Sequence, residues 1–387
     1  MADDGEAPAA KRLRCERLGS RLLAGARGYG KLILLGEHFV VYKVPALVAA
    51  VGRYTDCDVA FEAGAGIEVV DHRPAVPGYK AKKGAEGRAA VALVLDHLGV
   101  DYAAQKVTMT FGGDLTAARG RAAPTRAPRA GARGRRGARP RREPRARPTA
   151  GRARARVEGR PRARALRSTP AQVSGIGASA AQVVALARAL GQAVPALDLD
   201  EDAVNAAGYE GEKGYHGTPS GIDNTAATFG GVLKFARTAG APKFEKKALP
   251  APIRVVYAST GITASTTAVV ADVAAKRESD PAWFDGLLQS YVGLLARAEA
   301  ALDAGDVAAL GACLDENHAL CQKLTVSCAE LDALVLAARA AGAAGAKMSG
   351  TGRGGLMIAL TPSEESQAKV KAALEALAPQ VWTTFLN

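Results

Sequence analysis

The amino-acid sequence predicts an α+β fold with two domains. Segments with strand-like alternation and segments with helical periodicity are interleaved, but they do not follow the strict strand–helix–strand order of a doubly wound protein. A length of 387 residues allows two domains of ordinary size, and a hydrophobic content of 48% is typical of a globular chain. The sequence contains no apolar run of the length that a membrane-spanning helix needs.

The first part of the chain predicts mainly strands. Residues 28–51 hold two apolar runs parted by Gly36-Glu37-His38, which predicts a hairpin-like pair of strands. Residues 56–71 alternate around a Gly-rich turn, and 106–113 read as a further strand. Between them, residues 86–98 have helical periodicity.

The rest of the chain predicts mainly helices. They are expected at about 178–190, 200–210, 264–277, 281–303, 307–323 and 329–341, and over "SQAKVKAALEAL". Strands are expected at "GGVLKFA", at 252–260, after the Gly-rich loop near residue 350, and at "VWTTFL".

Residues 117–169 differ from the rest of the chain. They contain 19 of the arginines, no lysine and two acids, so they carry a net charge of +17, whereas the remaining residues are mildly acidic, at −4. Arg, Pro, Gly and Ala dominate, and no apolar periodicity is present, which predicts a disordered insert. We hypothesise that this insert is foreign to the fold. A polyanion- or RNA-binding role for it is the alternative from a different class of function.

The cysteines and the N-terminal residues bear on location. Five cysteines, an odd number in a long chain, predict reduced thiols. Residues 1–23 mix acids with bases and lack an apolar centre, which predicts a disordered segment rather than a secretory signal. We therefore expect a cytoplasmic protein, with organellar targeting left open.

Four segments carry candidate chemistry. The first holds Lys31, Glu37 and His38; it resembles a Walker loop, but Leu32 stands where Ser or Thr is needed and no helix follows. The second runs from Ser174 to Ala181 and opens a helix. Its small residues (Gly175, Ile176, Gly177, Ala178, Ser179 and Ala180 among them) allow backbone N–H groups to approach a phosphate, although simple helix capping has the same pattern.

The other two segments are also rich in small and polar residues. "EKGYHGTPSGIDN" begins with Glu212 and contains Asp223 near its end, where a buried Asp is ordinarily an N-cap. "KMSGTGRGG" contains Gly350, Thr351 and Gly352 and precedes an apolar strand, so a strained turn is the alternative reading.

Together these segments resemble the GHMP small-molecule kinases. "GKLILLGEHFVVYKVPAL", "SGIGASAAQ" and "KMSGTGRGG" are similar to the three motifs of that family. "HGTPSGIDN" is similar to its mevalonate kinase branch rather than to galactokinases or homoserine kinases. Two departures are Ala178, where the family commonly has Ser, and Tyr29, where it commonly has Pro. The resemblance covers about 27–115 and 173–387.

The resemblance implies a fold. It is the two-domain GHMP kinase fold, with a ribosomal protein S5 domain 2-like N-terminal domain and a ferredoxin-like C-terminal domain. We expect the ATP-binding N-terminal domain at 24–250, interrupted by the insert, and the C-terminal domain at 251–387.

The resemblance also implies the function of site residues. ATP and mevalonate would be the substrates and Mg²⁺ the metal, with Asp223 as the base and Lys31 beside it. Ser174–Ala180 would wrap the ATP phosphates, and Ser179 and Glu212 would hold Mg²⁺. The mevalonate end would be contacted by Glu37, His38, Thr266, Gly350, Thr351 and Gly352.

Several points stay open at this stage. A phosphomevalonate kinase or a mevalonate 3-kinase would have the same fold. No nucleic-acid partner and no membrane are expected, and a homodimer is left open.

Overall fold

The computed structural model describes residues 25–75, 78–115, 175–238 and 242–387, all within one compact unit. The predicted disordered N-terminus and the Arg-rich segment 117–169 lie outside the described residues, and so does Ser174. Within the described residues, no helix has the length and apolar character that a bilayer crossing requires.

The first sheet has β2 at its centre. Its strands are β1 (Arg27–Leu35), β2 (Ala46–Glu62), β3 (Gly66–Asp71), β4 (Lys106–Gly113), β5 (Val232–Ala236) and β6 (Lys243–Lys247). β2 is antiparallel to β1, β4 and β5, whereas β3 runs parallel to β4. A one-turn 3-10 helix at Val40–Tyr42 interrupts the connection between β1 and β2.

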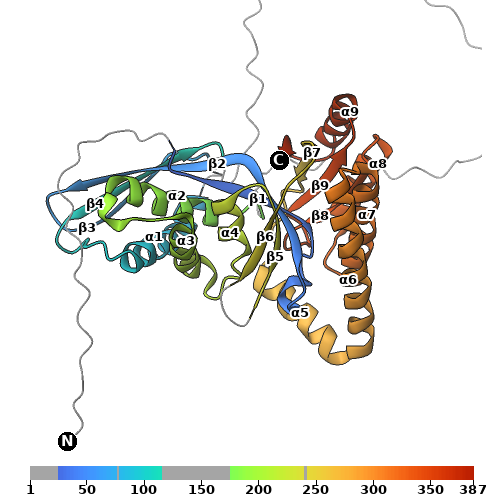
Figure 1. The fold of residues 1–387 in the computed structure, drawn as a ribbon, viewed down its shortest axis with the longest axis horizontal. Coiled ribbons are helices and arrows are strands. Elements are labelled where there is room, and N and C mark those ends of the chain that lie inside the picture. The colour runs from blue at the N-terminus through green and yellow to red at the C-terminus, as the bar shows by residue number, and fades with distance from the viewer. Residues whose placement is uncertain (1–24, 76–77, 116–174, 239–241) are drawn as a thin grey trace, which may run out of the picture. The chain divides into compact units, whose positions relative to one another are not determined.

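Four helices pack against this sheet and against each other. They are α1 (Tyr79–His97), α2 (Ala178–Ala193), α3 (Glu201–His216) and α4 (Ile222–Phe229), with a short 3-10 helix at Pro195–Leu197 after α2. Figure 1 shows them gathered on one face of the sheet. All residues of α2 from Ala180 to Leu190 except Arg188 are buried, so this helix forms the centre of the layer.

Glycines allow these elements to approach closely. A Cβ at Gly28 in β1 would lie 2.1 Å from the carbonyl oxygen of Ala181, so the strand lies directly on α2. On α3, a Cβ at Gly211 would lie 2.6 Å from Val183 Cγ1, and one at Gly214 would lie 2.4 Å from the Ala90 nitrogen. The backbones of β1, α2, α3 and α1 are therefore held at distances that no larger residue allows.

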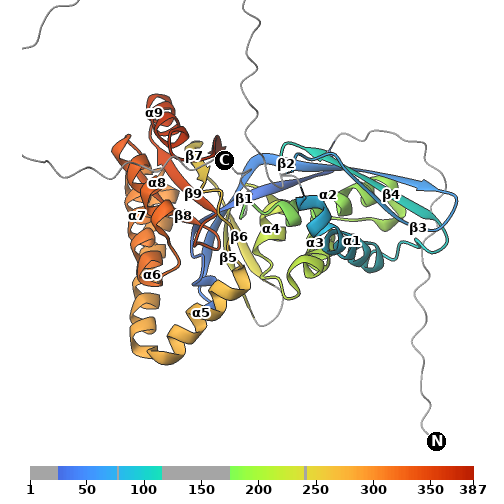
Figure 2. The ribbon, with the colours of Figure 1, turned by 180° about the vertical axis from the view of Figure 1, so that it is seen from behind.

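The second sheet is antiparallel throughout, in the order β10-β7-β9-β8. Its strands are β7 (Ile253–Ser259), β8 (Gly345–Ser349), β9 (Leu356–Thr361) and β10 (Gln380–Leu386). The helices of this region are α5 (Thr266–Ser279), α6 (Pro281–Ala304), α7 (Val307–Lys323), α8 (Ala329–Ala340) and α9 (Glu364–Glu375). α6 packs against α7, and α7 and α8 pack against β8 of this sheet (Figure 2).

Side-chain caps begin four of these helices. Ser265, Asp280, Asp306 and Ser363 each accept a hydrogen bond from the backbone N–H three residues further on. Such caps satisfy donors that the first turn of a helix leaves unpaired.

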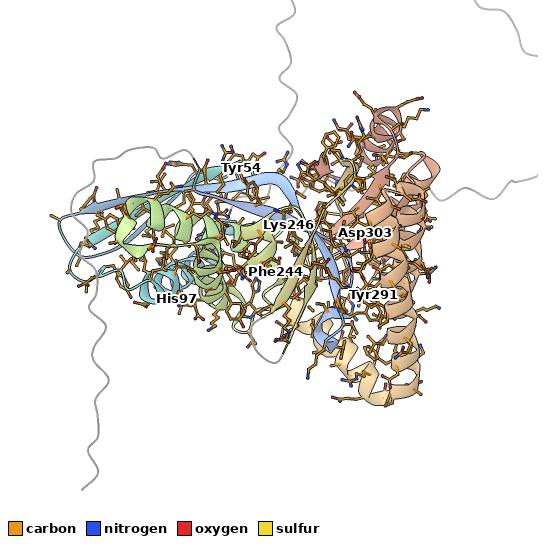
Figure 3. The ribbon with its side chains drawn as sticks, viewed as in Figure 1. Tyr54, His97, Phe244, Lys246, Tyr291 and Asp303 are labelled. Carbon is orange, nitrogen blue, oxygen red and sulfur yellow. The ribbon has the colours of Figure 1, made fainter. Side chains whose placement is uncertain are left out.

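The two sheets share one hydrophobic core. It contains Leu32 and Leu34 of β1 together with Val255 and Tyr257 of β7. Tyr291 of α6, labelled in Figure 3, stacks on Phe39 with ring centroids 4.5 Å apart and donates a 2.7 Å hydrogen bond to the Pro45 carbonyl. The predicted domain boundary at residue 250 falls between β6 and β7, but it stays a prediction, because the described residues form one unit.

The α+β prediction is confirmed, and four elements differ from expectation. α1 begins at Tyr79 rather than near residue 86. The prediction missed its first turns because "YKAKKGA" is mostly polar and small and carries no apolar period. "GAKMS" is a buried strand, β8, rather than the start of a loop. α4 and β6 were not expected; α4 has only eight residues and begins after Gly221 in a left-handed conformation.

The close contact at Gly28 predicts a stability effect. We expect Gly28→Ala to lower the free energy of unfolding by about 1–3 kcal/mol or more, because the new methyl group meets backbone that has no room to move. Urea unfolding followed by circular dichroism measures this. Gly52→Ala in β2 is the matched control, since the nearest atom to its Cβ is 3.9 Å away. Equal stability of the two variants would contradict the packing argument.

Candidate active site

Lys31 and Asp223 form an ion pair at the start of α2. Lys31 Nζ lies 3.1 Å from Asp223 Oδ1, and the two side chains are 6% and 30% exposed. A Cβ at Gly177 would lie 3.0 Å from Lys31 Cγ and 3.3 Å from Asp223 Oδ1. The structure therefore brings both predicted catalytic residues together, against the Gly-rich loop.

The Gly-rich loop reaches this place through its backbone conformation. Gly175 and Gly177 have φ values of 94° and 73°, the left-handed region that favours glycine, and Gly177 is the N-cap of α2. The Ile176 carbonyl accepts a 2.9 Å hydrogen bond from Lys31 N, which fixes the loop on β1. The N–H groups that begin α2, from Ala178 onward, thus start beside the ion pair.

Glu212 lies near Ser179 and Asp223. It sits on α3 and is only 2% exposed, and Ser179 makes a side-chain hydrogen bond with its carboxyl group. Burial, followed by the charge of Asp223, raises the pKa of Glu212 to about 8. Its Oε1 has no hydrogen-bond partner within the described residues. An incompletely satisfied buried carboxyl beside a second carboxylate is a group suited to a divalent cation.

His216 completes this cluster. Its Nε2 lies 3.8 Å from Glu212 Oε2 and 3.5 Å from Ser179 Oγ. Glu212 and His216 are four residues apart on α3, so they share one face of that helix.

His38 and Thr266 converge on Thr351. His38 Nε2 lies 2.8 Å from the Thr351 carbonyl oxygen, and because a carbonyl only accepts, Nε2 carries the proton. Burial lowers the pKa of His38, which favours the neutral ring. Thr266 Oγ1 lies 2.7 Å from Thr351 Oγ1. Three of the predicted substrate-binding residues, from distant parts of the chain, therefore meet.

Glu37 faces Lys347 instead. Glu37 Oε1 forms a buried ion pair with Lys347 Nζ, and the two side chains are 1% and 0% exposed. Glu37 directly precedes His38. Lys347 lies in β8, and Thr351 lies in the loop that follows β8. The ion pair therefore joins the segment that carries His38 to the segment that carries Thr351. Glu37 Oε2 has no hydrogen-bond partner among the described residues, so the predicted contact of Glu37 with a substrate stays a prediction.

The loop from Gly350 to Gly355 lies next to the Gly-rich loop. A Cβ at Gly350 would lie 3.8 Å from the Gly175 Cα, and one at Gly352 would lie 2.0 Å from the Val326 carbonyl oxygen. Ser349, just before it, both donates to the Ile33 carbonyl and accepts from Ile33 N at 3.0 Å. The predicted residues Gly350 and Gly352 thus belong to a loop that is held in place by backbone contacts.

Sequence reasoning missed two members of this site. Lys347 lies within the motif "KMSGTGRGG", and the sequence signal for it is a lone lysine in the apolar segment "GAKMS", which indicates a buried anionic partner. The signal for His216 is its spacing of four residues from Glu212 on one predicted helix face.

Family models match both halves of the chain. The model described as the GHMP kinases N terminal domain matches residues 157–231, and that described as GHMP kinases C terminal matches residues 298–380. The first match begins inside the Arg-rich segment.

Two mevalonate kinases are similar to this chain, one over part of its length and the other over nearly all of it. A mevalonate kinase of Thermococcus gammatolerans is 32% identical over 54% of this chain, but the chain spans only 62% of that relative's length. A mevalonate kinase of Pyrococcus horikoshii is 27% identical over 91% of this chain and 92% of its own length.

A solved structure is similar over nearly the whole chain. The crystal structure of L. major mevalonate kinase in complex with R-mevalonate is 36% identical, with a TM-score of 0.77, and the match covers 97% of this chain and 99% of that one. Because this 36% identical structure matches nearly the whole chain, and both GHMP kinase family models match the chain as well, the chain belongs to the GHMP kinase family.

Proposed function

We propose that this protein is a mevalonate kinase that transfers the γ-phosphoryl group of ATP to the C5 hydroxyl of (R)-mevalonate. The observation that carries the proposal is the Lys31–Asp223 pair, 3.1 Å apart, against Gly177 of the Gly-rich loop. An acceptor hydroxyl needs a base, and a phosphoryl donor needs backbone N–H groups, within the same small space. The mevalonate kinases that match this chain support the choice of substrate.

Asp223 is the proposed base and Lys31 its partner. Asp223 accepts the proton of the C5 hydroxyl while the oxygen attacks the γ-phosphorus atom, the bond to the bridging oxygen breaks, and ADP leaves with that electron pair. Lys31 holds the Asp223 carboxylate in place, and its charge stabilises the negative charge that develops during transfer.

Backbone N–H groups are the proposed ATP phosphate ligands. The loop from Gly175 to Ala180 ends in the first turn of α2, where unpaired N–H groups and the helix dipole favour an anion. Ala178 replaces the hydroxyl that is common in the family, so Ser179 is left as the side-chain donor in this turn.

Ser179 and Glu212 fit a bound Mg²⁺. The buried Glu212 oxygen without a partner and the raised Glu212 pKa describe a carboxyl group that a cation would satisfy. Mg²⁺ usually takes only one or two carboxylates and completes its ligands with water and substrate phosphates. When bound, it would neutralise phosphate charge.

His38, Thr266 and Thr351 are the proposed contacts of the mevalonate end. Their polar groups meet within hydrogen-bond distance, and the neutral His38 ring has Nε2 already committed to Thr351. We also propose, from the family resemblance of the motifs, that the enzyme serves isoprenoid and sterol precursor synthesis, and, from the reduced thiols that its cysteine count predicts, that it is cytoplasmic.

Purified protein should release ADP when it is given ATP, Mg²⁺ and mevalonate together. A coupled ADP assay measures this, and phosphorus NMR of the product should place the phosphate on C5. Phosphomevalonate and homoserine serve as competing acceptors in the same assay. Turnover of phosphomevalonate in preference to mevalonate, or a product phosphorylated at C3, would overturn the assignment.

The proposed base predicts a separation of binding from turnover. Asp223→Ala should lower kcat by about 10²–10⁴-fold or more, because general-base help is lost, while ATP still binds. Asp303→Ala is the control, since Asp303 lies at the end of α6 and is paired only with Lys247 among the contacts of the described residues. Wild-type-like turnover of Asp223→Ala would refute the role of Asp223.

The raised pKa of Glu212 predicts a pH-dependent Mg²⁺ affinity. Below about pH 8 the folded protein holds a proton on Glu212, and Mg²⁺ must displace it. Affinity for Mg²⁺ in the ADP-bound enzyme should therefore rise about tenfold per pH unit from pH 6 toward 8 and then level off.

Calorimetric titrations in buffers of different ionisation enthalpy should detect the released proton. Glu212→Gln should bind Mg²⁺ more weakly and without this pH dependence. A pH slope that is the same in wild type and Glu212→Gln would contradict the assignment of the proton to Glu212.

A further inference from the structure

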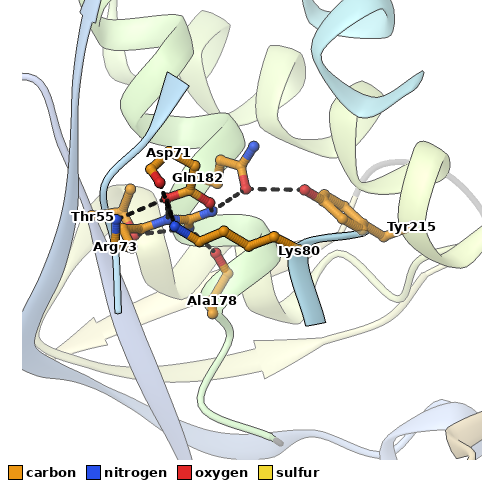
Figure 4. A network of polar contacts seen from close by, with 7 residues as sticks. All are labelled: Thr55, Asp71, Arg73, Lys80, Ala178, Gln182 and Tyr215. Carbon is orange, nitrogen blue, oxygen red and sulfur yellow. Dashed lines mark hydrogen bonds and ion pairs between the residues drawn. The ribbon is translucent and has the colours of Figure 1, made fainter. Parts of the chain in front are cut away.

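Arg73 is a buried arginine with an acceptor for every donor. Its side chain is 5% exposed, and it follows β3 in the chain. Nε and Nη2 donate to the two carboxylate oxygens of Asp71 at 3.0 and 2.9 Å, and Nη1 donates to Thr55 Oγ1 at 3.3 Å. The remaining two N–H groups donate to the Ala178 carbonyl at 3.4 Å and to Gln182 Oε1 at 2.6 Å. All five guanidinium donors are therefore used (Figure 4).

Asp71 balances the charge of Arg73. Burial alone would raise the pKa of Asp71, but the hydrogen bonds and charge of Arg73 outweigh it and hold that pKa below its ordinary value. Lys80 Nζ lies 3.7 Å from Asp71 Oδ1 and adds to this effect. The carboxylate thus stays ionised, and the guanidinium is fixed to the end of β3 by a two-point contact.

The two contacts on α2 lie on either side of Ser179. Ala178 is the first residue of the helix and Gln182 begins its second turn, so Arg73 fixes the turn that carries the Ser179 hydroxyl. Arg73 itself makes no contact with Ser179 among the hydrogen bonds of the described residues.

The network continues to α3 through Tyr215. Gln182 Oε1 also accepts a 3.0 Å hydrogen bond from the Tyr215 hydroxyl, and Figure 4 shows Tyr215 and Arg73 on opposite sides of that amide. Tyr215 precedes His216 and follows Glu212 by three residues on the same helix. The chain of contacts from Arg73 thus reaches both elements that carry the metal-binding groups suggested above.

We propose that Arg73 is a positioning residue for the nucleotide and Mg²⁺ side of this site: it sets Ser179 on α2 and, through Gln182 and Tyr215, Glu212 on α3. The inference rests on the proposed function, because it assigns ATP and Mg²⁺ to these helices. The Lys31–Asp223 pair and the His38–Thr351 contact lie outside the network, so binding of the phosphoryl acceptor does not depend on it.

The test separates nucleotide binding from acceptor binding. Arg73→Lys keeps the charge but cannot present five donors in a planar fork. In the full chain, we expect the KM for ATP and the Mg²⁺ concentration for half-maximal activity to rise about 10–100-fold, as for other residues that orient ligating groups. The KM for mevalonate should stay at the wild-type value.

Two further variants keep the test decisive. Arg188→Lys is the matched control on the same helix: Arg188 contacts Glu201 and the carbonyls of Thr228 and Arg27, away from the first turn of α2. It should lower thermal stability without changing the KM for ATP. Tyr215→Phe removes one hydroxyl and should raise the Mg²⁺ requirement by about threefold to tenfold even if Arg73→Lys folds poorly.

Calorimetry with Mg²⁺ and ADP distinguishes the possible failures. Weaker Mg²⁺–ADP binding in Arg73→Lys supports the positioning role even if mevalonate proves not to be the acceptor, in which case only the proposed function fails. Wild-type Mg²⁺–ADP affinity in both Arg73→Lys and Tyr215→Phe would overturn the inference. A parallel rise in the KM for ATP and mevalonate, or an equal loss in Arg188→Lys, would also overturn it, because those results describe a general loss of stability.

Discussion

The arrangement of the site depends on a buried ion pair between Glu37 and Lys347. Glu37 follows β1 of the first sheet, Lys347 lies in β8 of the second, and neither side chain is more than 1% exposed. Removing one partner would leave an unpaired charge in the core, at a cost of about 3–5 kcal/mol. The hydroxyl of Ser349, bonded twice to the Ile33 backbone, joins the same two strands. His38 and Thr351, which follow these two strands, therefore take their relative position from this junction.

The two carboxyl groups of the site have contrasting surroundings. Asp223 is 30% exposed and has Lys31 at 3.1 Å, whereas Glu212 is nearly buried and its pKa is raised to about 8. Environments that differ in this way suit one carboxyl group to proton transfer and the other to a cation. The difference arises from helix placement, because Asp223 lies in the first turn of the short α4 and Glu212 lies in the buried face of α3.

Local features of the sequence predicted much of the fold and site. The start of α2 was predicted closely, since Gly175 and Gly177 mark a turn and a strong apolar period follows. The pairing of Lys31 with Asp223 came from family resemblance, because no local rule joins residues so far apart. Lys347 was missed for the same reason: its partner Glu37 is 310 positions away, and only folding brings them together. α1 was predicted too short because its polar first turns carry no periodic signal.

Gly30 of β1 packs closely against residues on both sides of positions 116–174. A Cβ at Gly30 would lie 2.8 Å from Leu115 Cδ1 and 3.1 Å from the Ile176 carbonyl oxygen, so the described residues on either side of positions 116–174 are both anchored on one strand. The entropy lost on closing a loop between two such anchors grows only with the logarithm of its length. The free energy of folding therefore depends only weakly on how many residues join the two anchors. The Arg-rich segment 117–169 could therefore be lengthened or shortened at little cost in the free energy of folding.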